Sequence, residues 1–170
     1  MAIEFGHARF VWNWALETRT KAYKESKESL NYSILNRQLT ALKQTACPWL
    51  LAKPPPVALP KKLKEQDTAF RNFFSGRARY HRFKSHHHTP SVRYQLDQRH
   101  VAKKFNAEST RLILPKLGAL KLKWSCEVGG IPKVVTVNKD PAGRYFVSMA
   151  CEVEMNGLLA RRNAFGVDAA

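Results

Sequence analysis

The chain has 170 residues, of which 44% are hydrophobic, and its 29 Lys and Arg against 13 Asp and Glu give a formal net charge of +16. A chain of this length can bury a core without disulfides or metals, and such a positive charge favours phosphate-rich partners, nucleic acid before anionic membrane. No run of about 18 apolar residues could span a membrane, and Met1 to Gly6 lack the features of a secretory signal, so we expect an intracellular protein.

The first half of the chain predicts three helices. Apolar residues recur at helical spacing from Ala8 to about Lys24, and after a polar break Asn31 is typical of an N-cap before the next helix. A third helix should begin near 57–59, because Pro60 is tolerated only in a first turn. Its apolar face should be built from Leu59, Leu63, Phe70 and Phe74. The first two helices can form a helix-turn-helix, although most helical hairpins are only packing units.

A basic and aromatic stretch, Phe70 to Ser85, follows on the third helix, and no acidic residue occurs between Asp67 and Asp97. Cations neutralise phosphates and release counterions, while aromatic rings and guanidinium planes stack on unpaired bases. We therefore predict that this region binds nucleic acid. The predicted contacts are Arg71, Arg77, Arg79, Tyr80, Arg82, Phe83, Lys84 and Arg93. The alternative is a solvated basic loop whose aromatic residues belong to the core.

The histidine triplet at 86–88 and three cysteines are the candidate metal ligands. Histidine-rich tracts can bind metals. A closed zinc site, however, needs four ligands at defined spacing, and Cys47, Cys126 and Cys151 include no Cys-x-x-Cys pair. We predict no metal site in this chain.

Past His88 the apolar period changes from that of a helix to that of a strand. The candidate strands are 91–96, 111–114, 119–124, 133–138 and 145–153, with turn signals at Gly129-Gly130 and at Asp140-Pro141. The sequence thus predicts an α+β protein, in which a helical, helix-turn-helix-like region (1–88) precedes a small antiparallel β-barrel or sandwich (89–160) and a terminal segment (161–170).

Several blocks in this order closely resemble the TnpB (OrfB) family of insertion-sequence proteins. They are Phe5 to Leu16, Leu30 to Lys43, Asp67 to Phe74 and Tyr80 to Ser85, and Leu114 to Gly118 and Gly166 to Asp168 stand where that family has similar motifs. The resemblance implies a transposon-encoded transposase related to RNA-guided DNA nucleases. In that architecture a helical recognition region and a β-barrel wedge region hold guide RNA and the guide–target duplex, so base pairing reads the sequence.

The resemblance also places Asp168 at the first carboxylate of a RuvC-like nuclease site, where several acidic residues hold metal ions that activate water. One carboxylate cannot build that site, and the later acidic motifs and the four-cysteine zinc module do not occur in these 170 residues. The Mg²⁺ and zinc belong to the family nuclease, so we expect no cofactor here and no cutting by this chain alone. The family's usual first strand is also missing before Phe5, which should leave the barrel with an exposed edge.

Residues and resemblance together predict a truncated TnpB-like transposase that binds structured RNA or DNA. It should reside in the cytoplasm of a prokaryotic cell, associated with the nucleoid, and a separate polypeptide could supply the nuclease. Two alternatives stay open, namely a stand-alone helix-turn-helix regulator that reads a defined DNA site, and a decayed remnant without a specific function.

Overall fold

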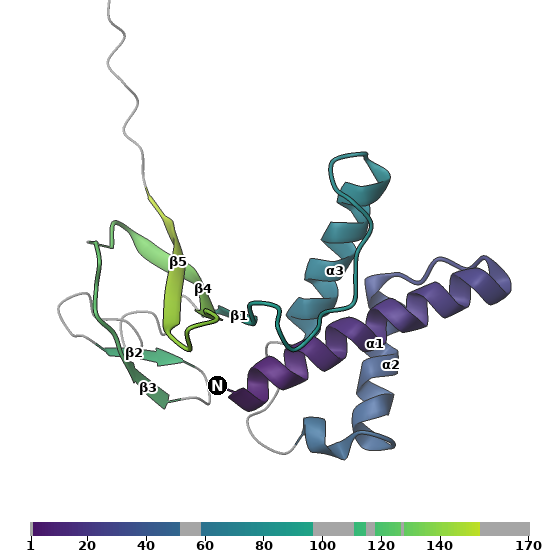
Figure 1. Ribbon diagram of the computed structural model, residues 1–170, viewed down its shortest axis with the longest axis horizontal. Coiled ribbons are helices and arrows are strands. Elements are labelled where there is room, and N and C mark those ends of the chain that lie inside the picture. The colour runs from purple at the N-terminus through teal and green to yellow at the C-terminus, as the bar shows by residue number, and fades with distance from the viewer. Residues whose placement is uncertain (1, 52–58, 97–110, 115–117, 127, 154–170) are drawn as a thin grey trace, which may run out of the picture.

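The computed structural model describes residues 2–51, 59–96, 111–114, 118–126 and 128–153, and it confirms the predicted α+β class. A helical half is followed by antiparallel strands (Figure 1). The helices are α1 (Ala2–Ser26), α2 (Tyr32–Gln44), the 3₁₀ turn η1 (Pro48–Leu50) and α3 (Leu59–Phe74). The strands are β1 (Ser91–Gln95), β2 (Arg111–Leu114), β3 (Gly118–Lys121), β4 (Ile131–Lys139) and β5 (Tyr145–Glu152).

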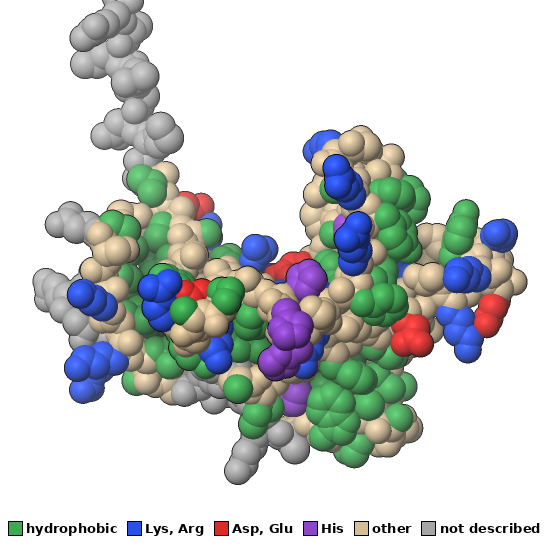
Figure 2. All heavy atoms as spheres, in the orientation of Figure 1, with side chains coloured by type: hydrophobic (Ala, Val, Ile, Leu, Met, Phe, Trp, Pro, Cys, Tyr) green, Lys and Arg blue, Asp and Glu red, His purple; other side chains and the backbone are tan. Residues whose placement is uncertain are grey.

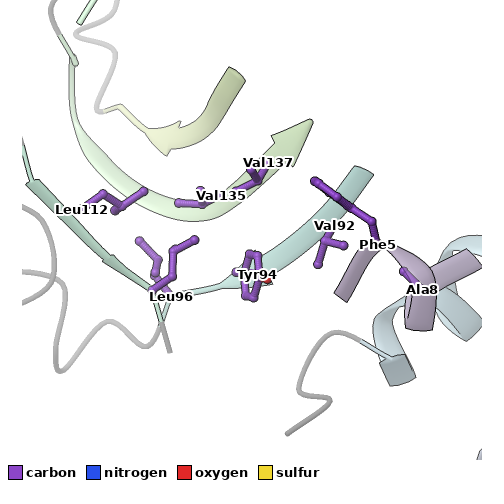
Figure 3. Packing of buried hydrophobic residues seen from close by; sticks show 9 residues of the cluster. Phe5, Ala8, Val92, Tyr94, Leu96, Leu112, Val135 and Val137 are labelled. Atoms are coloured by element: carbon purple, nitrogen blue, oxygen red, sulfur yellow. The ribbon is translucent and has the colours of Figure 1, made fainter. Parts of the chain in front are cut away.

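Helix α1 begins at Ala2, earlier than the predicted start at Ala8, because its first turns pack against the strands. Phe5 and Ala8 are buried in the core of the sheets (Figure 3), and the Tyr94 hydroxyl of β1 donates a hydrogen bond to the Glu4 carboxylate. Residues of the next turns lie in a separate core with α2 and α3. One helix therefore joins the two halves of the protein, and residues 2–5 are helical.

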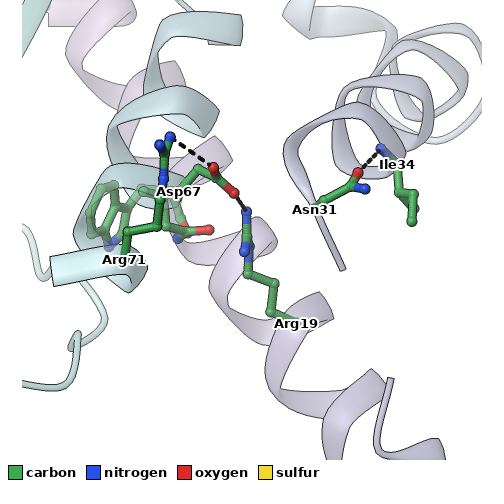
Figure 4. A network of polar contacts seen from close by, with 7 residues as sticks. Arg19, Asn31, Ile34, Asp67 and Arg71 are labelled. Carbon is green, nitrogen blue, oxygen red and sulfur yellow. Dashed lines mark hydrogen bonds and ion pairs between the residues drawn. The ribbon is translucent and has the colours of Figure 1, made fainter. Parts of the chain in front are cut away.

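The other two helices follow the sequence pattern closely. Asn31 caps α2, since its side-chain oxygen accepts a hydrogen bond from the Ile34 N–H at 3.0 Å (Figure 4). Helix α3 places Pro60 in its first turn as predicted, and Leu59 and Leu63 are buried. The prediction for Phe74 is wrong: its side chain is 77% exposed, because the helix extends past the core before it ends.

The predicted small antiparallel barrel or sandwich appears as two antiparallel sheets among the described residues. One sheet has the order β1-β4-β5 and the other is the β2-β3 hairpin. Residues such as Tyr94, opposite Val135 in the register, supply the buried face. Among the described strands β2 and β3 pair only with each other, so no barrel closes there, and β3 ends at Lys121 rather than near Trp124.

Glycines at two turns explain the hairpin geometry around β4 and β5. Gly130 has φ +90°, and a Cβ at this position would overlap the carbonyl oxygen of Glu152. Gly143 has φ +86° and donates its N–H to the Asp140 carbonyl at 3.0 Å. Both positions need the conformational freedom of glycine, as the turn signals predicted.

Asp168 and the predicted terminal segment 161–170 lie outside the described residues, and the domain boundaries at 88 and 160 stay predictions. Within the described ranges, no helix is both long and apolar enough to cross a membrane.

Candidate nucleic-acid interface

The end of α3 directs the chain back across the helical half. Gly76, with φ +72°, donates its N–H to the Phe73 carbonyl, and Arg77 donates to the Asn72 carbonyl, both at 2.9 Å. This is the Schellman arrangement, in which a left-handed glycine satisfies the last carbonyls of a helix and reverses the chain. The residues that follow, 77–85, are called the basic segment below.

Side chains of α1 hold the basic segment in place. Asn13 accepts a hydrogen bond from the Lys84 N–H at 2.8 Å and donates one to the Lys84 carbonyl at 3.0 Å. The Trp12 indole N–H donates to the Arg82 carbonyl at 3.3 Å. The segment runs back from the end of α3 toward α1 (Figure 1). Because its backbone is fixed at this end, the side chains that point outward do so from a defined position.

Three arginines of the basic segment, Arg77, Arg79 and Arg82, are exposed. Among the described residues, no carboxylate lies within ion-pair distance of them, and the Arg77 Nε–H donates only to the Ser75 hydroxyl at 2.9 Å. Arginines that are exposed and unneutralised favour contact with phosphate.

Arg71 and Arg93, two of the other predicted contacts, already have acidic partners. Arg71 lies 3.2 Å from Asp67, which also binds Arg19 at 3.0 Å (Figure 4). Arg93 lies 3.7 Å from Glu65. The sequence argument considered only the interval after Asp67. In the fold, Asp67 and Glu65 of α3 lie beside these two arginines. Both arginines remain exposed, and their roles as phosphate contacts stay predictions.

Lys84 is more buried than a surface contact would be. Its ammonium lies 4.2 Å from the centre of the Trp12 ring. Burial lowers the pKa of Lys84, the nearby charge of Lys62 lowers it further, and Glu65 opposes the change. Lys84 therefore anchors the segment on α1 in addition to any contact with a ligand.

Aromatic side chains of α3 gather around Tyr80 at the other end of the segment. The Tyr80 ring packs edge-on against Phe73, with 5.2 Å between centroids, and it is still 48% exposed. Phe83, which precedes Lys84, is 56% exposed and does not line the groove formed there. A groove of about 500 Å³ lies between the last turns of α1 and α3, and we call it the aromatic groove. Its wall includes Tyr23, Phe73, Phe74, Tyr80, Lys24 and Lys27.

Sequence reasoning missed the α1 side of the aromatic groove. Arg19, Tyr23 and Lys27 follow each other at four-residue spacing, which puts the first two on one face of α1. The Lys27 ammonium lies 5.2 Å from the centre of the Tyr23 ring. The four-residue spacing of a cation, an aromatic ring and a second cation was the signal available in the sequence.

The described residues do not fit the metals that the resemblance implies. Among them, no group of three or more His, Cys, Asp and Glu side chains could hold a metal ion. Cys47, Cys126 and Cys151 are free thiols. No step through zinc or magnesium can therefore be derived from these side chains, and the expected absence of a metal stays a prediction.

Comparison with known proteins agrees with the resemblance. Residues 1–28 match a family model described as a helix-turn-helix domain, of the OrfB/IS605 type. The chain is 34% identical over 168 residues to a "Putative RNA-guided DNA endonuclease" of Streptomyces pristinaespiralis, covering 97% of this chain and 40% of that protein. It is 30% identical over 151 residues to the "Putative RNA-guided DNA endonuclease InsQ" of Escherichia coli K12, covering 89% of this chain and 36% of that protein.

The chain thus spans about two fifths of the length of these curated relatives. The two matches cover 97% and 89% of this chain, so each includes parts of both the helical half and the strands. On this evidence, the chain belongs to the TnpB (OrfB) family of insertion-sequence proteins.

Proposed function

We propose that this chain binds RNA or single-stranded DNA through the basic segment and the aromatic groove. The observation that carries the proposal is that the segment with the unneutralised arginines also contributes Tyr80 to the wall of the aromatic groove. Arg77, Arg79 and Arg82 supply phosphate contacts, and Tyr23 and Phe74, which are 58% and 77% exposed, supply stacking surfaces.

The shape of the surface favours backbone contacts over base-specific reading. Guanidinium groups on a fixed segment neutralise phosphates whatever the sequence. Rings accept any base, because every base has a flat face. The proposal is therefore a scaffold that holds nucleic acid while base pairing supplies the sequence specificity, in keeping with relatives named as RNA-guided endonucleases.

We further propose that these 170 residues bind nucleic acid without cutting it, and that they need no cofactor to bind. Asp168 would be the one acidic residue at a family nuclease position, whereas two-metal hydrolysis requires several. The partner is structured RNA, DNA or both, bound in the prokaryotic cytoplasm near the nucleoid. A separate polypeptide would supply any nuclease chemistry.

The test compares two variants with equal loss of charge by fluorescence anisotropy. One replaces Arg77, Arg79 and Arg82 with Gln, and the control replaces Arg37, Lys121 and Lys123, which are exposed elsewhere. Binding of a labelled RNA is measured between about 50 and 200 mM salt. The first variant should lose at least about a hundredfold in affinity at low salt and about 2 units of the log–log salt slope, and the control should lose much less. Equal losses in both variants would show that only net charge matters.

The second candidate function is a helix-turn-helix reader of duplex DNA, which the match at residues 1–28 favours. Of these residues, Ala2–Ser26 form the single helix α1, which contributes buried residues to both cores. A site-specific reader would prefer one duplex over random DNA by about 4–10 kcal/mol. Selection from a pool of random duplexes distinguishes the two functions, since a scaffold should enrich no sequence.

A further inference from the structure

A second groove, of about 370 Å³, lies at the opposite end of α1 from the aromatic groove. It is bounded by the first turns of α1, the segment from Lys84 to Ser91, and the β4–β5 turn. Arg9 and Tyr23, on the two grooves, are 14 residues apart, or about 21 Å along the helix axis. The two grooves are thus separate places on the surface.

The walls of this groove carry an excess of positive charge. The cations come from four parts of the chain, and they are Arg9, Lys62, Lys84 and Lys139. The lining carboxylate Asp140 is held by Arg144 at 2.7 Å, and Glu65 lies 2.7 Å from Lys62. Within the described ranges, Arg9, Lys84 and Lys139 have no carboxylate at ion-pair distance.

Burial makes this excess costly in the absence of an anion. Lys62 is only 4% exposed, and its charge acts on Lys84 across the groove, where burial and this repulsion together lower the pKa of Lys84. A bound anion would offset both effects. His86, His87 and His88 line the same groove and add ring N–H donors, and Figure 2 shows histidine side chains gathered between the helical half and the sheets.

We propose that this groove binds a phosphate group. Its cations approach from α1, α3, the basic segment and β4, so they suit a tetrahedral anion with oxygens in several directions better than a flat carboxylate. The volume lies within the range of about 300–1,000 Å³ that is typical of small-ligand sites. The phosphate belongs either to a nucleic-acid backbone or to a free phosphate ligand. The proposal does not depend on the function proposed for the basic segment, since Arg9 and Lys139 lie outside that segment.

Inorganic phosphate is the first probe, titrated into the full 170-residue chain at constant ionic strength and followed by calorimetry. The test variant is Arg9→Gln with Lys139→Gln, and the control with equal loss of charge is Arg37→Gln with Lys121→Gln. The test variant should bind phosphate at least about tenfold more weakly, since it loses two charge-assisted contacts with the anion. The control should stay within about twofold of the parent. If the test variant retains the affinity of the control, the proposal is wrong.

A labelled RNA is the second probe, and it distinguishes the two sources of phosphate. If the groove holds a backbone phosphate, the test variant should also lose about 1 unit of the salt slope for RNA binding. If it holds a free phosphate ligand, the slope should match that of the control while phosphate binding is still lost. If the double variant fails to fold, both measurements are repeated with Lys139→Gln alone, because Lys139 is the last residue of β4. Loss of RNA binding at the basic segment would leave the phosphate result unchanged, so the two proposals fail separately.

Discussion

The side-chain amide of Asn13 binds both backbone groups of Lys84, accepting from its N–H at 2.8 Å and donating to its carbonyl at 3.0 Å. The two residues are 71 positions apart, so this pair of bonds attaches the basic segment to the middle of α1. An amide is the side chain that can satisfy an N–H and a carbonyl of the same residue at once.

Replacing Asn13 with Ala should therefore weaken both the fold and the binding of RNA. Loss of two hydrogen bonds should lower the free energy of unfolding by about 1–3 kcal/mol, measured by urea denaturation. RNA affinity should also fall, although no charge is removed, because Arg82 and its neighbours lose their fixed position. Thr40→Ala, which removes an exposed hydroxyl bonded within α2, is the control and should change neither quantity appreciably. Unchanged RNA affinity in a destabilised Asn13→Ala protein would show that the order of the segment is irrelevant to binding.

Gly130→Ala should destabilise the protein far more than Gly129→Ala, although the two glycines are neighbours. Gly130 combines φ +90° with close approach to the Glu152 carbonyl oxygen, whereas a Cβ at Gly129 would meet nothing within 4 Å. Strain at a positive φ and the steric overlap should together cost about 2–4 kcal/mol, against less than about 0.5 kcal/mol for the control. Thermal or urea denaturation of the two variants measures the difference. Similar stabilities would mean that the turn opens to accept the added carbon.

Local signals predicted much of this fold. Asn31 caps a helix because its oxygen replaces a missing backbone partner, and Pro60 confines the start of α3 because its ring has no N–H to donate. Both effects act within a few residues of the chain. The alternation of apolar residues in β4 and β5 is equally local, and those strands occur where it predicts them.

Features that depend on distant partners were not predictable in the same way. The early start of α1 depends on Phe5 packing against strands about 90 residues later, and the two-sheet arrangement depends on which strands pair. The candidate interface divides similarly. Sequence identified the basic segment, but only the fold shows that Asp67 pairs with Arg71 and that Tyr23 and Phe74 line the same groove.

The aromatic groove should distinguish single strands from duplexes. Tyr23→Ala with Phe74→Ala should weaken binding of single-stranded DNA by about 1–3 kcal/mol for each base that loses a stacking partner, and should leave duplex affinity nearly unchanged. Both rings are exposed, so the free energy of unfolding should change little. Ile113→Ala, which removes an exposed apolar side chain from β2, is the control. Equal weakening for both nucleic acids would assign the rings a role in the fold instead of in stacking.

His7 should make the protein less stable in mild acid. Its side chain is 8% exposed and packs against Trp49, with 5.0 Å between ring centroids, and burial lowers the pKa of His7 below its ordinary value. Between that lowered pKa and about 6.5, the unfolded chain binds more protons than the folded chain. The free energy of unfolding should therefore fall as the pH is lowered through this window. His7→Phe, which keeps a ring beside Trp49, should have a shallower pH dependence in parallel urea titrations, and identical slopes would contradict the assignment to His7.

Binding by these 170 residues should be independent of divalent metal, and no cutting should accompany it. The described side chains offer no group of three metal ligands, and hydrolysis of the two-metal type needs several carboxylates around one phosphate. EDTA should leave RNA affinity unchanged, and DNA incubated with the protein and Mg²⁺ or Mn²⁺ should stay intact, for the parent and for Asp168→Ala alike. Cleavage by the parent that Asp168→Ala abolishes would show that Asp168 finds other metal ligands. Retained binding without cleavage would mean that this region holds nucleic acid. The salt dependence of binding by the arginine variants would then measure how many phosphates it contacts.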